Sequence, residues 1–134
     1  DPRWSEAEFP RPENPIWLCD TLGDMGMVYR CAKAALIGGT FSEIEGHNPW
    51  EAAALECPTL HGPRTGNFKS DFATLDAASA SIPVLTSTDV SIALLSSDLA
   101  ATAKNASACI EDAQTQTNAL ATRLIELLEK PHAI

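Results

Sequence analysis

The residues best suited to chemistry lie in a loop that leaves one short apolar run and leads into a helix. The loop carries two polar strings, Gly38-Gly39-Thr40 and Gly46-His47-Asn48. Paired glycines let a ligand approach the backbone closely, and a helix that begins after the second string would present free N–H groups and a positive dipole end. This combination suits a phosphate. The loop has neither the Gly-Lys-Ser/Thr of a P-loop nor a G-x-G-x-x-G fingerprint, so it predicts a generic anion site.

Two side chains near that helix start each allow two interpretations. Glu51 stands three residues after Asn48, the spacing of a capping box, and the spacing alone favours a carboxylate that reaches back to the Asn48 N–H. The alternative is a carboxylate that accepts hydrogen bonds from a ribose diol. His47 is most simply a loop histidine, but at a helix start it could also donate to a phosphate, because an anion favours its protonated form.

The elements that must position these residues alternate along the chain. Short apolar runs at 16–19, 34–37, 59–61 and 82–85 predict strands, the last of them an edge strand because of Pro83. Helices are predicted from about 24 to 32, from 48 to 55, from a cap at Asn67, and from 89 onward. This alternation predicts an α/β, Rossmann-like parallel sheet flanked by helices. Ligands of such sheets bind beyond the carboxyl ends of the strands.

The chain divides into a leader and one domain. Residues 1–15 hold four prolines among charges and predict an extended Pro-rich leader that packs on nothing. Residues 16–134 form the predicted domain. Its last helix carries an apolar stripe at helical spacing. The members of the stripe are Ile110, Ala113, Thr117, Leu120, Leu124 and Leu127.

Composition excludes several classes of protein. The 134 residues include 18 acidic and 9 basic side chains, a net charge of −9, and the nine basic residues do not cluster as duplex-DNA binding requires. A hydrophobic content of 45% is too high for a disordered acidic tail, and no run is long enough for a transmembrane helix. No pair of the four cysteines has C-x-x-C spacing, so a zinc site is not expected.

Four strings, in order, resemble one enzyme family. They are Cys19-Asp20-Thr21-Leu22-Gly23-Asp24-Met25, Ala35-Leu36-Ile37-Gly38-Gly39-Thr40, Glu45-Gly46-His47-Asn48-Pro49-Trp50-Glu51-Ala52-Ala53 and Gly62-Pro63-Arg64-Thr65-Gly66-Asn67-Phe68. They look like G-D-T-M-G-E-L, A-F-V-G-G-S, G-G-H-N-P-L-E-P-A and G-P-H-x-x-N-F. Over residues 16–129 the chain therefore resembles the C-terminal domain of 3-deoxy-D-manno-octulosonic acid (Kdo) transferases, which are GT-B glycosyltransferases.

The resemblance implies an inverting transfer of Kdo from CMP-Kdo to a lipid A precursor in lipopolysaccharide biosynthesis. It implies no metal and no cofactor besides the donor substrate, and no nucleic-acid partner. It places the general base and the acceptor site in an N-terminal domain, so no catalytic residue is expected here. The chain is then part of a longer enzyme of the bacterial inner membrane's cytoplasmic face. We expect this fragment to be soluble and inactive by itself.

The resemblance also assigns roles to individual positions. Gly38, Gly39 and Thr40 would line the phosphate pocket. Gly46, His47 and Asn48 would lie beside the phosphate and the sugar, and Glu51 would hold the ribose hydroxyls. Gly23 and Met25 would lie near the cytosine.

One departure from the family pattern bears on the site. Glu45 replaces the first glycine of G-G-H-N, and a carboxylate near a phosphate pocket is repulsive unless it points away. Two alternatives therefore stay open: a GT-B transferase for another nucleotide sugar, and a non-catalytic nucleotide-binding or interaction module. A truncated sheet would also expose an edge, through which two copies could pair as a homodimer.

Overall fold

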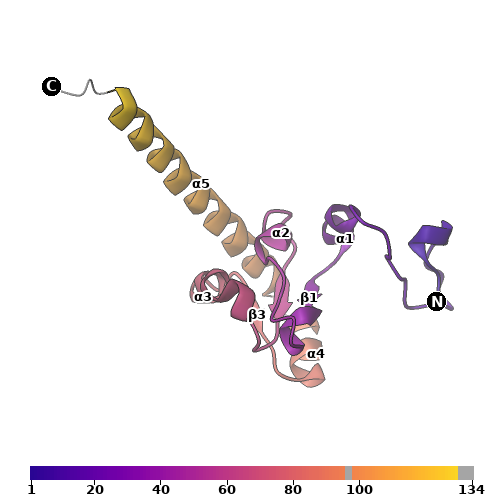
Figure 1. Ribbon diagram of the computed structural model, residues 1–134. Coiled ribbons are helices and arrows are strands. Elements are labelled where there is room, and N and C mark those ends of the chain that lie inside the picture. Colours follow the sequence, from indigo (N-terminus) through magenta and orange to yellow (C-terminus); the bar gives the residue numbers. More distant parts are fainter. Residues whose placement is uncertain (96–97, 130–134) are drawn as a thin grey trace.

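The computed structural model describes residues 1–95 and 98–129, so the end of the predicted domain at 134 lies outside the described residues. Three short strands form one parallel sheet in the order β1-β2-β3 (Figure 1). They are β1 (Ala35–Ile37), β2 (Thr59–His61) and β3 (Ile82–Pro83). The register pairs Ala35 with Thr59 and Leu60 with Ile82. Helices connect the successive parallel strands, which confirms the predicted Rossmann-like α/β class.

The helices follow the predicted order. They are α1 (Met25–Cys31), α2 (Trp50–Ala53), α3 (Lys69–Ala77), α4 (Ser87–Leu95) and α5 (Leu99–Glu129), with 3-10 turns η1 (Trp4–Glu6), η2 (Gly38–Phe41) and η3 (Gly66–Phe68). Helix α2 is a single turn, because Glu56 adopts a left-handed φ of 56° and Pro58 follows. The predicted helix 48–55 is therefore shorter than expected.

Both faces of the sheet are covered. Leu60 in the middle of β2 packs towards α4 and the start of α5, in a cluster with Ala93 and Leu99. His61 faces the other way, and its ring centroid lies 4.5 Å from that of Phe72 in α3. Another apolar cluster contains Ala53, Leu75 and Ala106, so that α2, α3 and α5 pack against one another there. Successive side chains of a strand point to opposite faces of the sheet, which explains why Leu60 and the following His61 contact different helices.

The first predicted strand is absent. Residues 16–19 contribute one isolated bridge, between Arg3 and Leu18, and Ile16 is 61% exposed. The apolar run pairs with the N-terminal segment instead of joining the sheet. The expectation that residues 1–15 pack on nothing is therefore wrong. The Trp4 ring lies edge-on to the Trp17 ring, with 5.4 Å between the ring centroids, and the Trp4 Nε1 donates to the Asp24 carboxylate at 3.0 Å.

Two local expectations also differ from the structure. The Asn67 side chain caps no helix, and its Nδ2 donates to the Ile44 carbonyl oxygen at 2.6 Å. On α1 the buried residue is Tyr29, whereas Cys31 is exposed. The buried face of a helix with only two turns depends on where its neighbours lie, so its apolar residues alone did not identify that face.

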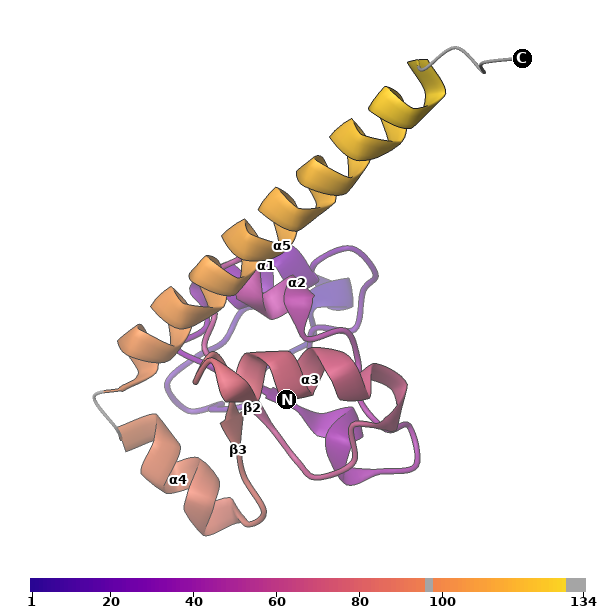
Figure 2. The same cartoon turned by 90° about the vertical axis from the view of Figure 1, so that its left-hand side faces the viewer.

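Helix α5 extends far beyond the sheet. Its first part packs on α2, and the remainder projects away from the domain (Figures 1 and 2). The predicted apolar stripe therefore begins partly buried at Ile110, and its later leucines are open to solvent, with Leu120 61% and Leu124 53% exposed. Among the described residues no helix has the length and hydropathy to cross a membrane.

The close approach at Gly62 provides a test of the packing. A Cβ there would lie 2.7 Å from the Thr40 carbonyl oxygen and 2.8 Å from the Phe41 ring, whereas one at Gly38 would meet nothing within 4 Å. Neither glycine has a positive φ, so only space distinguishes the two. We expect Gly62→Ala to lower the free energy of unfolding by about 2 kcal/mol. Gly38→Ala should change it by roughly 0.5 kcal/mol or less. Urea unfolding measures both, and equal effects would contradict the packing.

Candidate functional site

A cavity of about 810 Å³ opens at the carboxyl end of β1. Its walls come from α1, the loop after β1, the start of α2, and η3. The lining residues are Leu22, Met25, Tyr29, Leu36, Ile37, Gly38, Ile44, Gly46, His47, Asn48, Glu51, Asn67 and Phe68. This is the position at which ligands bind parallel α/β sheets.

The cavity brings together six of the nine residues that the sequence proposed. The six are Met25, Gly38, Gly46, His47, Asn48 and Glu51. The other three, Gly23, Gly39 and Thr40, do not line it. Gly23 adopts a φ of 94° in the turn before α1, where glycine is favoured for its backbone conformation.

Thr40 has a structural role in place of the predicted phosphate contact. The residue is fully buried, its hydroxyl donates to the Ile37 carbonyl, and the same oxygen accepts the Gly62 N–H at 2.6 Å. A hydroxyl engaged in this way has little capacity left for a ligand. Gly39 also has a packing reason to be glycine, since a Cβ there would lie 3.0 Å from Nδ1 of His47. The small residue lets the His47 ring lie against the backbone.

The helix start at α2 differs from the predicted anion site. Asn48 acts as expected, because its Oδ1 accepts the Trp50 N–H at 3.1 Å. Pro49 has no N–H, however, and a helix of four residues has only a small dipole. Any anion selectivity would therefore come from individual N–H groups and from the exposed His47 at the cavity wall.

Glu51 is not a capping residue. Its side chain is exposed, lines the cavity, and makes no hydrogen bond or ion pair with any residue in the described ranges. A capping box requires the carboxylate to accept the Asn48 N–H, and that bond is not formed. The alternative interpretation, a carboxylate available to a ligand, is the one that the geometry favours.

Glu45 turns away from the cavity. Its carboxylate lies 3.8 Å from an Arg64 guanidinium nitrogen, and a side chain at Gly66 would collide with it. Glu45 itself has a φ of 57°, a conformation in which glycine is favoured, so the glycine of the family motif suits the backbone at this position. The carboxylate is therefore directed at Arg64 and is not among the groups that line the cavity.

The cavity also has apolar and aromatic lining residues that the sequence did not identify as site residues. Tyr29, Leu36 and Phe68 line it, although none was proposed as a site residue. Leu36 and Phe68 belong to the motif strings, so their position beside Gly38 and Asn67 was a usable signal. Tyr29 had no such signal, because only the orientation of α1 brings it to the cavity.

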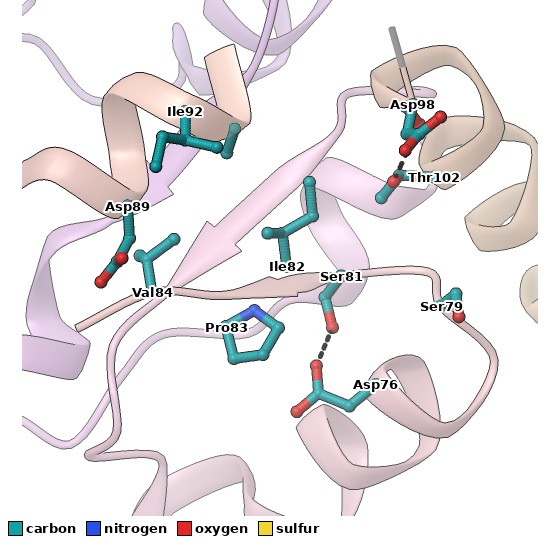
Figure 3. Close-up of a pocket in the computed structure, with 11 residues that line it drawn as sticks. Asp76, Ser79, Ser81, Ile82, Pro83, Val84, Asp89, Ile92, Asp98 and Thr102 are labelled. Atoms are coloured by element: carbon teal, nitrogen blue, oxygen red, sulfur yellow. Dashed lines mark hydrogen bonds between the residues drawn. The ribbon is translucent and has the colours of Figure 1, made fainter. Parts of the chain in front are cut away.

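A second cavity, of about 510 Å³, lies beside β3 and is shown in Figure 3. Asp76 accepts hydrogen bonds from Ser81 and pairs with His61, whose Nε2 lies 2.9 Å away. Asp89 accepts the Leu85 N–H, and this bond, with those from Thr86, holds the pKa of the carboxyl below its usual value. The cavity is thus lined by carboxylates that internal donors already engage, and it is unsuited to an anionic ligand.

Comparisons with known proteins show which family the chain resembles. No family model matches the chain. Residues of the chain are 40% identical over 73 residues to the 3-deoxy-D-manno-octulosonic acid transferase of Bordetella pertussis, and 33% identical over 70 residues to that of Haemophilus influenzae. The crystal structure of the C-terminal CMP-Kdo binding domain of WaaA from Acinetobacter baumannii superimposes with a TM-score of 0.68 at 25% identity. The chain resembles the C-terminal domain of Kdo transferases.

The matches cover a larger share of this chain than of the relatives. The match to the Bordetella Kdo transferase covers 54% of this chain but 17% of that protein, and the Haemophilus match covers 52% and 16%. The structural match covers 78% of this chain and 58% of the Acinetobacter chain. The sequence matches thus cover about half of this chain and about a sixth of the relatives' length.

Tyr29 provides a direct test of the site geometry. Burial, and next the charge of Glu51, raise the pKa of its hydroxyl above the usual value near 10. Tyr29 is the chain's single tyrosine, so near-ultraviolet tyrosinate absorbance reports on it alone. We expect its midpoint above the usual value, and Glu51→Gln should bring it closer to that value without restoring it, since burial is the larger cause.

The raised pKa of Tyr29 also makes the stability of the fold depend on pH. Because the Tyr29 hydroxyl loses its proton at a lower pH in the unfolded chain than in the folded one, its contribution to the free energy of unfolding is complete below about pH 10 and falls as the pH rises further. For the titration of Tyr29, the control is Glu43→Gln in the exposed loop, which should leave the midpoint of the tyrosine titration unchanged. A tyrosine midpoint at or below the usual value would contradict the placement of Tyr29 beside Glu51.

Proposed function

We propose that this chain is the CMP-Kdo binding region of a Kdo transferase, with residues 16–134 as the donor domain and 1–15 as its leader. The observation that carries this proposal is the single cavity in which Gly38, Gly46, His47, Asn48 and Glu51 meet. These residues come from two motif strings that resemble those of the family, and the similar Acinetobacter domain is described as CMP-Kdo binding.

The lining residues suit different parts of a nucleotide sugar. Gly38 leaves open space where a side chain would stand and so does not hinder a phosphate, and His47 and Asn48 supply donors in the same lining. Among the described residues the lining contains no lysine or arginine, so N–H groups and His47 would hold the charge of a departing CMP phosphate. Leu22, Met25 and Phe68 are apolar lining residues, against which a base would lie.

The activity of the whole enzyme is also a proposal. In this proposal, Kdo passes to a lipid A precursor at the cytoplasmic face of the bacterial inner membrane. The precursor is held by a region like the one that makes up the rest of the relatives, outside the matched 17%. The reaction would be inverting, with its general base outside this chain. This chain alone would then bind the donor without transferring it. Kdo transfer by the isolated 134-residue chain would contradict that division of labour.

Nucleotide titration followed by NMR tests the donor site. We expect CMP to shift the amide signals of Gly38, Gly46, His47 and Glu51 more than UMP or AMP does. Glu51→Gln should weaken CMP binding about tenfold, because hydrogen bonds to a charged acceptor are stronger than those to a neutral one. Glu43→Gln, which alters a carboxylate outside the cavity, is the matched control.

The titration has two outcomes that would overturn the proposal. If CMP binds but shifts residues around the second cavity, the ligand site has been misplaced. If UMP binds more tightly than CMP, the chain serves another nucleotide sugar. A chain that binds none of the three nucleotides would favour the non-catalytic interaction module.

The sheet supports a further proposal, a homodimer formed at its edge. In the described part of the chain no strand pairs with the outer edge of β1, and Leu36 at its centre is 47% exposed. An unpaired edge is a template for pairing with a second copy. We expect light scattering to show a mass that rises towards a dimer with concentration. A strict monomer at high concentration would remove this proposal.

A further inference from the structure

We propose that the Tyr29 hydroxyl and the Glu51 carboxylate act together as a recognition pair for the hydroxyl groups of the ligand's pentose, which makes Tyr29 a specificity-determining residue. The inference rests on the proposed function, since it concerns the same cavity. It goes beyond that function by adding a residue from α1 that no motif assigned, and by stating what the residue distinguishes.

The position of Tyr29 is fixed by packing. The residue is 8% exposed and clusters with Ala52 of α2 and with Cys57, which lies between α2 and β2. The ring nevertheless lines the cavity. A ring anchored on one side and open on the other has a defined direction, which a surface tyrosine would lack.

The Tyr29 hydroxyl has no partner within the described ranges of the chain. It takes part in no hydrogen bond there, although every enclosed side-chain nitrogen or oxygen of those residues has a partner. The hydroxyl must therefore reach solvent, and Tyr29 is a lining residue of the cavity. Buried polar groups are nearly always satisfied, so an unpaired hydroxyl at a cavity wall is a group available to a ligand.

Glu51 provides the complementary group. Its carboxylate lines the same cavity and is also unpartnered among the described residues. The charge of Glu51 acts on the Tyr29 hydroxyl and, with burial, keeps its pKa raised, so at neutral pH the phenol is a protonated donor. Both residues line this one cavity, and no hydrogen bond joins them directly.

Tyr29 and Glu51 line one cavity without bonding to each other, and a phenol donor and a carboxylate acceptor together match the chemistry of a sugar hydroxyl. A hydroxyl placed between them donates to the carboxylate and accepts from the phenol, so both protein groups are satisfied at once. A pentose that lacks that hydroxyl leaves two desolvated polar groups unpaired, which is costly. The pair should therefore distinguish a ribonucleotide from its deoxyribonucleotide.

Calorimetric titration with CMP and 2′-deoxyCMP tests this inference. We expect the full chain to bind CMP about tenfold more tightly than 2′-deoxyCMP. Tyr29→Phe keeps the ring and its packing but removes the hydroxyl, and should reduce this ratio to about twofold. Glu51→Gln should reduce it as well, and the double variant should lose little more than either single variant, because one ligand hydroxyl serves both groups.

Cys57→Ala and Glu43→Gln are the controls. Cys57→Ala disturbs the cluster that holds Tyr29 and removes no polar group from the cavity, so it should reduce the ratio only as far as it moves the Tyr29 ring, whereas Glu43→Gln, outside both the cluster and the cavity, should leave the ratio unchanged. If Tyr29→Phe keeps the full ratio while the unmodified chain binds CMP, the recognition pair is wrong and the proposed function stands. If the unmodified chain does not bind CMP, both the proposed function and this inference are overturned.

Discussion

The hydroxyl of Thr40 is the contact on which the site depends. It donates to the carbonyl of Ile37 at the end of β1 and accepts the N–H of Gly62 just beyond β2, while the Thr40 carbonyl accepts the Arg64 N–H at 3.0 Å. A single buried residue thereby ties together the two loops that follow neighbouring strands. Because hydrogen bonds in the interior leave costly unpaired groups when broken, the loops share one relative position.

The glycines around Thr40 follow from this contact. Gly62 lies so close to the Thr40 backbone that no side chain fits, and a Cβ at Gly46 would lie 3.2 Å from the Thr40 methyl group. Gly46 also needs a φ of 95°, which places the following residues, His47 and Asn48, at the cavity wall. The glycines of the motif thus serve packing as much as ligand approach. His61 extends the tie to α3, with its ring nitrogens at 2.8 Å from the Gly62 carbonyl and 2.9 Å from Asp76.

The cavity that results has both polar and apolar lining residues. Its polar groups are glycine backbone, the His47 imidazole and amides, together with one carboxylate, and the described lining holds no lysine or arginine. In a chain with a net charge of −9, selectivity for an anionic ligand must therefore come from oriented N–H groups and not from a basic surface. The outward turn of Glu45 towards Arg64 is consistent with such a site, because it directs a carboxylate at a cation outside the lining.

The sequence by itself determined the alternation of strands and helices, the three strands that form, and the loop that holds most of the site, because periodicity, glycine pairs and helix-start residues act locally. It could not determine which side chains face the ligand. Thr40 is buried and Tyr29 reaches the cavity because β2 packs against the first loop and α1 packs against α2, contacts between segments far apart in the chain. The run at 16–19 shows the same limit. Its apolar residues predict that it pairs with another segment, but only the tertiary structure decides that this segment is the N-terminal one and not the sheet.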